Sequence, residues 1–182
     1  MAISYPEGHF SIELPEDRSF RLESCDTYVQ ISGKGVKEMD FGWIEAEGRT
    51  LWLMEFKDYD HQEAPDPERE HLVDNLSTKV RDVLTMVATA WAETDFGEHL
   101  HRDLRDTCSR FPDRACAIRP LIVLNLSRAD ASRLIGALKN EINAELEGIR
   151  EMFGISSVTV LPVGHPMIEE KLEIQITQTD QE

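Results

Sequence analysis

The stretch EMDFGWIEAEGRTLWLMEFKDY, residues 38–59, decides the fold and most of what the sequence indicates about function. Both arms are rich in apolar residues, and Gly48 stands first in the central pair of EGRT, residues 47–50. That placement predicts a β-hairpin closed by a two-residue type II′ turn at Gly48–Arg49. With the turn fixed there, Asp40 faces Lys57 and Gly42 faces Glu55 across the two strands.

The two faces of this hairpin differ in character, because side chains alternate along a strand and opposed residues share a face. One face is apolar near the turn and charged at the far end, and Gly42 leaves space there beside Glu55. Partly buried carboxylates need a cation, and Mg²⁺ or Mn²⁺ with its water shell fits Asp40 and Glu55. Lys57 beside such an ion could orient or deprotonate a bound water. The charged face holds Asp40, Gly42, Ile44, Leu51, Leu53, Glu55 and Lys57, and the other holds Phe41, Trp43, Trp52, Met54 and Phe56.

Asp40, followed by Glu55-Phe56-Lys57 on an apolar strand and then by a long helical pattern, resembles the PD-(D/E)xK superfamily of restriction-endonuclease-like nucleases. The resemblance implies a core of helix, three-stranded meander, helix and strand, and a metal-dependent phosphodiesterase acting on DNA. It implies that Asp40 and Glu55 are metal ligands, that the Phe56 carbonyl completes the coordination, and that Lys57 positions the attacking water. Lys79, on the following helix, corresponds weakly to an extra polar residue of some families.

The chain departs from the family pattern at two points. Met39, not Pro, precedes Asp40, and no helix is evident before the first strand, where Glu23 and Asp26 are the nearest acidic residues. The resemblance covers about half of the chain and leaves residues 128–182 unexplained.

The rest of the chain predicts a single α/β domain over residues 1–182, with a mixed central sheet and flanking helices. A strand is expected from Tyr28, before a Gly-Lys-Gly turn. A helix is expected over 67–94, a short surface helix before Pro112, and a doubly covered strand over 118–127. A further helix, capped by Ser127 and ended by Gly154, precedes two closing strands in SSVTVLPVG and LEIQITQ. The apolar stripe of the first long helix consists of Leu72, Leu76, Val80, Val83, Val87 and Trp91.

Composition limits the partners. The 182 residues include 19 basic and 35 acidic ones, a formal net charge of −16, which argues against broad sequence-independent binding of nucleic acid. DNA affinity of the isolated chain should therefore be weak, with a small positive rim of Lys34, Lys37 and Lys79, and tight binding should need a homodimer or a basic protein partner.

No apolar run could span a membrane, and no signal-peptide pattern opens the sequence, so a cytoplasmic protein is expected. The odd count of three cysteines predicts free thiols.

Several alternatives remain open at this point. An acidic residue followed by an ExK occurs by chance in many hairpins, where an Asp40–Lys57 ion pair on an exposed face would explain it. The same fold could serve as a non-catalytic interaction module with an acidic surface, or as a structural subunit without a site. The residues His99, His101, Cys108 and Cys116 could be assembled into a zinc site, but their spacing matches no established ligand pattern. His61 and His71 could contact a substrate phosphate, and Trp43 and Trp52 should pack under a helix.

Overall fold

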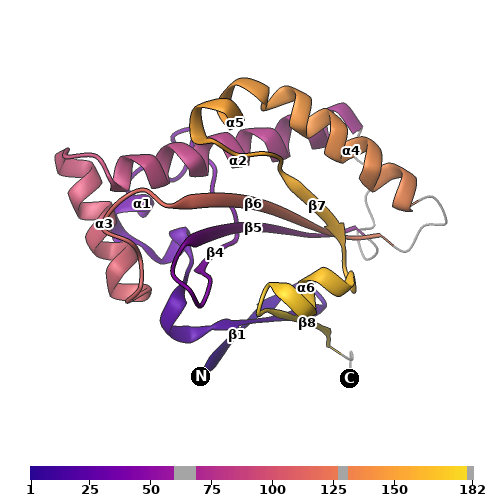
Figure 1. Cartoon of the computed structure of the whole chain (residues 1–182), viewed down its shortest axis with the longest axis horizontal. Helices are drawn as coiled ribbons and strands as arrows, with labels where there is room; N and C mark the ends of the chain where they lie inside the picture. Colours follow the sequence, from indigo (N-terminus) through magenta and orange to yellow (C-terminus); the bar gives the residue numbers. More distant parts are fainter. Residues whose placement is uncertain (60–68, 127–130, 180–182) are drawn as a thin grey trace.

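A computed structural model of the chain describes residues 1–59, 69–126 and 131–179. It consists of three layers (Figure 1): helices α2, α4 and α5 cover one face of a five-stranded sheet, and a three-stranded sheet with α6 covers the other. One apolar core lies between the helices and the large sheet, and a second lies between the two sheets. The α/β fold class with a mixed central sheet and flanking helices is therefore confirmed.

The large sheet has the order β3-β4-β5-β6-β7. Neighbours β3, β4 and β5 are antiparallel, whereas β6 and β7 run parallel to β5. Both parallel connections pass through helices on the same face, since parallel strands need a crossover. These strands are β3 (Ser19–Phe20), β4 (Phe41–Ile44), β5 (Thr50–Asp58), β6 (Ala117–Asn125) and β7 (Thr159–Pro162). The antiparallel small sheet contains β1 (Ala2–Glu7), β2 (Phe10–Pro15) and β8 (Gln175–Gln178).

The helices follow the apolar periodicities of the sequence. All six residues of the expected stripe belong to or pack against the first core, where burying each Leu or Val contributes roughly 1.5–3 kcal/mol. The second long helix is divided at Leu146 into α4 and α5, and Gly154 ends α5 with a φ of 64°. Ser127, Pro67 and His61 lie outside the described residues. The helices are α1 (Asp26–Val29), α2 (Arg69–Ala90), α3 (Asp95–Thr107), α4 (Ala131–Glu145), α5 (Glu147–Phe153) and α6 (Pro166–Lys171), with single 3-10 turns at Glu16–Arg18 and Leu22–Ser24.

The expected hairpin exists, but its turn was predicted wrongly. Glu45 pairs with Thr50, and the Gly48 N–H donates to the Glu45 carbonyl at 2.8 Å, so four residues form the connection. Gly48 closes it with a φ of 71°, a left-handed conformation that favours glycine. The register is displaced by two positions from the expected one, because Gly42 pairs with Leu53 rather than Glu55. Both faces keep their predicted residues, since a displacement of two preserves the alternation.

The strand expected from Tyr28 is instead the short helix α1, followed by turns. Tyr28 is buried and its hydroxyl donates to Glu38, whereas Val29 is 58% exposed, the reverse of a strand that buries valine. The Thr27 N–H donates to Asp103 at 2.7 Å, a bond to α3 that replaces any pairing with the sheet. The first strand of the meander is β3, which pairs with β4.

The two C-terminal strands belong to different sheets. β7 extends the large sheet beside β6, but β8 pairs with β2 of the small sheet. Trp43 and Trp52 stack at 5.9 Å in the second core, where they share one apolar cluster with residues of the small sheet and of the helix α6. None of the described helices is long and apolar enough to cross a bilayer.

Candidate active site

The charged end of the hairpin lies at the carboxyl end of β5. Glu55 and Lys57 project toward α2, because they alternate in step with Leu51 and Leu53, which face the first core. Asp40 lies in the bend just before β4, and Lys79 reaches down from the middle of α2. The structure therefore brings the expected residues together from the hairpin and the helix.

Glu55 is the centre of this group. Its side chain is 0% exposed, and Oε1 lies 2.7 Å from Lys57 Nζ and 2.6 Å from Lys79 Nζ. The Lys57 and Lys79 side chains are 27% and 16% exposed, so both remain partly accessible to water. Glu55 Oε2 is buried and has no hydrogen-bond partner among the described residues. A buried carboxylate oxygen without a partner is costly, and such an atom calls for an explanation.

The protonation states of this group follow from burial and charge. Burial raises the pKa of Glu55, and the negative charge of Asp40 raises it further, while Lys57 and Lys79 oppose the shift. Burial alone would lower the pKa of Lys57, but the carboxylates of Glu55 and Asp40 outweigh it, and the pKa is raised. Lys57 is therefore a cation at neutral pH. It can orient a water molecule or stabilise negative charge, but it has no lone pair with which to deprotonate water.

Asp40 connects the bend to β5 through the backbone. Its Oδ2 accepts a hydrogen bond from the Phe56 N–H at 2.8 Å. In an extended strand the N–H and C=O of one residue point to the same side. The Phe56 carbonyl is therefore directed to the side of β5 on which Asp40 lies, as the expected ligand set requires.

Some expectations for this site were wrong. Gly42 does not leave space beside Glu55: a Cβ built on it would lie 2.2 Å from the Phe20 ring, which fills that volume. Lys57 pairs with Glu55 on its own strand, and the described contacts include no Asp40–Lys57 ion pair. Lys79 is not part of a free positive rim, because Glu55 engages it.

The donor set for a metal ion is small. No group of three or more His, Cys, Asp or Glu side chains close enough to hold a metal occurs within 1–59, 69–126 and 131–179. The pair Asp40 and Glu55, with the Phe56 carbonyl, provides oxygen ligands only. Such a set suits Mg²⁺ or Mn²⁺, which keep several of their waters and need one or two carboxylates.

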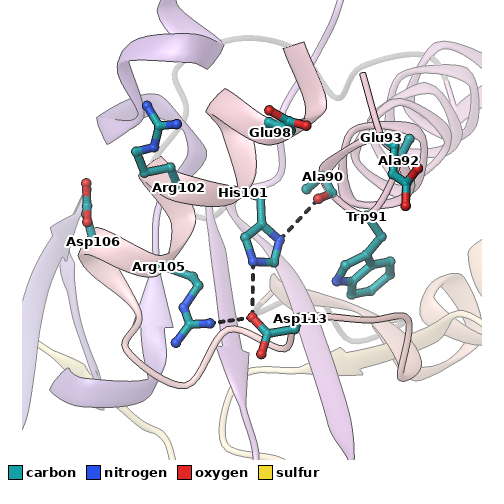
Figure 2. Close-up of a pocket in the computed structure, with 10 residues that line it drawn as sticks. All are labelled: Ala90, Trp91, Ala92, Glu93, Glu98, His101, Arg102, Arg105, Asp106 and Asp113. Carbon is teal, nitrogen blue, oxygen red and sulfur yellow. Dashed lines mark hydrogen bonds and ion pairs between the residues drawn. The ribbon is translucent and has the colours of Figure 1, made fainter. Parts of the chain in front are cut away.

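The histidine and cysteine combination does not form a zinc site. Figure 2 shows His101 in a surface cavity between α2, α3 and the segment before β6. Its Nδ1 lies 3.1 Å from the Ala90 carbonyl and its Nε2 lies 3.5 Å from Asp113, so both ring nitrogens face oxygen atoms. Cys108 is buried, and burial raises its pKa to about 11, unlike a metal-bound thiolate.

Two neighbours of the site were not predicted from the sequence, the ion pair of Arg21 with Glu7 and the side chain of Tyr59. Arg21 binds Glu7 and Glu23 at 2.9 Å each, and its guanidinium lies 4.9 Å from the centre of the Phe41 ring. Burial raises the pKa of Glu7, and the charge of Asp40 adds to this shift, which places Glu7 within electrostatic range of the site. No local sequence pattern connects Glu7, in the hairpin formed by β1 and β2, to Asp40.

The second neighbour is Tyr59, which follows β5 directly. Burial raises the pKa of Tyr59, and the charges of Lys57 and Glu55 act on the same pKa in opposite directions. The sequence did carry a signal for this residue, because Tyr59 stands two positions after Lys57 and so continues its strand face.

Comparison of the chain with known protein families, with curated proteins and with solved structures found no match. The resemblance to the PD-(D/E)xK nucleases therefore depends on the residues and geometry of this chain alone.

Proposed function

We propose that the protein is a metal-dependent phosphodiesterase acting on DNA, with Asp40, Glu55 and Lys57 as the core of its active site. The observation that carries this proposal is the state of Glu55. Its fully buried carboxylate has one oxygen held by two lysines, and the other oxygen has no hydrogen-bond partner among the residues that the structure describes. A buried carboxylate oxygen of this kind is suited to bind a cation, and Asp40, which accepts a hydrogen bond from the Phe56 N–H, would supply a second oxygen.

The residues present fit Mg²⁺ or Mn²⁺. Asp40, Glu55 and the Phe56 carbonyl would hold the ion, which when bound lowers the pKa of a coordinated water and stabilises developing negative charge. Lys79 fixes Oε1 of Glu55 and so orients Oε2. Lys57, which stays protonated beside Glu55, would orient the attacking water rather than remove a proton from it.

Binding and turnover test this proposal separately. Purified protein should bind Mn²⁺ at millimolar concentration or below, and should nick or cut DNA with Mg²⁺ or Mn²⁺ but not with EDTA. Asp40→Ala should lose both properties, because it removes a ligand. Lys57→Ala should lose turnover and keep Mn²⁺ binding, because the lysine does not touch the ion. Wild-type protein that binds no divalent ion would end the proposal.

The surface charge sets the expected affinity for DNA. The excess of 35 acidic over 19 basic residues repels nucleic acid. Lys34 is exposed, and Lys37 donates its ammonium to Asn75 at 2.7 Å, a neutral partner. Two phosphate contacts predict that affinity falls about tenfold between 50 and 200 mM salt. Titration of labelled DNA in Ca²⁺ measures this, and tight binding at high salt would contradict it. A homodimer or a basic protein partner would supply the missing cations.

One observation favours a second candidate, a non-catalytic interaction module with an acidic surface. Lys57 and Lys79 already give Glu55 its counter-charge, so the carboxylate has cationic partners in the absence of any metal. In that case the three residues form a structural ion cluster, and neither Mn²⁺ binding nor DNA cleavage should be observed.

A further inference from the structure

Tyr59 occupies a defined position beside the proposed site. Its N–H donates to the Asn125 carbonyl at 3.1 Å, which extends the pairing of β5 with β6 one residue beyond Asp58. Side chains alternate along a paired strand, so Tyr59 continues the face of Glu55 and Lys57. The residue is half-buried, and it packs against the first core.

The two ends of the Tyr59 side chain have different surroundings. The ring packs against the apolar core, whereas the charges that act on the hydroxyl are those of Lys57 and Glu55. Burial is the largest cause of the raised pKa of Tyr59, so the phenol keeps its proton at neutral pH and is a donor.

Hydrolysis of a phosphodiester is accelerated by such a donor, because the departing sugar oxygen is a strong base. The other polar groups of the site have different tasks. Asp40 and Glu55 must be ionised to hold a cation, and the ammonium groups of Lys57 and Lys79 point at Oε1 of Glu55. Among the described residues placed at the site, Tyr59 is left as the neutral donor.

We propose that Tyr59 is the general acid of the reaction and donates its hydroxyl proton to the leaving oxygen of a phosphodiester. This inference rests on the proposed function and adds the class of substrate, an ester whose leaving group is an unactivated sugar alkoxide. The oxygen of water forms a bond to phosphorus as the bond from phosphorus to the sugar oxygen breaks. The sugar oxygen takes the proton of Tyr59, the proton of the attacking water passes to solvent, and the tyrosinate regains a proton from solvent.

The test compares two substrates in the variant Tyr59→Phe, which keeps the packed ring and removes only the hydroxyl. A short oligonucleotide has an alkoxide leaving group, whereas bis(4-nitrophenyl) phosphate releases 4-nitrophenolate, which leaves without a proton. We expect kcat on the oligonucleotide to fall about 100-fold, the lower range for general acid catalysis. On the nitrophenyl ester kcat should change less than about threefold, and Mn²⁺ affinity should match that of the wild type.

Tyr5→Phe is the matched control, because Tyr5 also packs its ring, against Phe41, but on the opposite face of the large sheet. It should leave the ratio of the two rates unchanged. Equal losses on both substrates in Tyr59→Phe, or no loss on either, would overturn the role of Tyr59 while leaving the phosphodiesterase proposal standing. A wild-type protein that binds Mn²⁺ but cuts neither substrate, or binds no Mn²⁺ at all, would remove the proposed function and this inference with it.

Discussion

Glu55→Gln separates a functional site from a structural ion cluster, because the two readings predict opposite changes in stability. Glutamine keeps the shape of the side chain and can still accept from Lys57 and Lys79 through its carbonyl oxygen. It removes the charge from a position that is 0% exposed. If the carboxylate is retained for a reaction, its removal should stabilise the fold and abolish Mn²⁺ binding.

The size of the effect follows from two opposing contributions. Changing two charge-assisted hydrogen bonds to ordinary ones loses roughly 2–3 kcal/mol in total. Relieving the burial of a carboxylate gains several kcal/mol, and the lysines left behind are part-exposed and can hydrate. Burial and the charge of Asp40 raise the pKa of Glu55, so the folded environment disfavours its ionised form, and we expect the gain to be the larger contribution. We expect Glu55→Gln to stabilise the protein by about 1 kcal/mol at pH 7, which raises Tm by about 2–4 °C.

Urea unfolding of wild type and Glu55→Gln between pH 4.5 and 8 measures this difference. Because the pKa of Glu55 is raised in the folded state, the folded protein holds the Glu55 proton more tightly than the unfolded chain does. The resulting stability is fully present below the ordinary pKa of 4.5 and is lost as pH rises through the raised pKa of the folded state. The advantage of the variant should therefore grow with pH over that range. Glu170→Gln, at an exposed position of α6, is the control and should show no such trend. Destabilisation by more than about 2 kcal/mol at pH 7 would refute the reasoning and support a structural cluster.

Two further outcomes test the core and the thiols. Gly42→Ala should destabilise the fold by about 3 kcal/mol in urea unfolding, because the new methyl group would overlap the buried Phe20 ring, with its atoms 2.2–2.7 Å away; a change below about 1 kcal/mol would show that the ring moves aside freely. In native protein at pH 8 a thiol reagent should modify half-buried Cys116 before Cys25 and Cys108, because burial raises the pKa of the Cys25 and Cys108 thiols to about 12 and about 11. Mass spectrometry of the labelled peptides measures the order of modification, and labelling of Cys25 first would contradict this expectation.

The features that depend on short-range periodicity were predicted correctly from the sequence. The stripe of α2 and the alternation of β5 could be read from the sequence because helical and strand periods are short-range properties. The first hairpin was missed, although Phe10, Ile12 and Leu14 alternate and are all buried in the second core. The Phe20 ring under Gly42 could not be predicted, because only the pairing of β3 with β4 brings the two residues together. The same is true of Lys79, whose contact with Glu55 depends on how α2 packs across the sheet.

Glu55 and Lys57 lie on the predicted face of the hairpin despite the wrong turn, and the reason is the period of the strand. The expected and observed registers differ by two positions, and a shift of two leaves each side chain on its face, whereas a shift of one would have moved Glu55 and Lys57 into the second core. The shift does change the neighbours. One step beyond the last pair of the hairpin, Phe41 with Met54, the observed register sets Asp40 opposite Glu55 instead of Lys57. Two carboxylates are thereby placed side by side, which explains why the charge of Asp40 raises the pKa of Glu55. Lys57 and Lys79 relieve that repulsion at Oε1, whereas Oε2 has no partner within residues 1–59, 69–126 and 131–179, so the proposed divalent cation would relieve the remainder there.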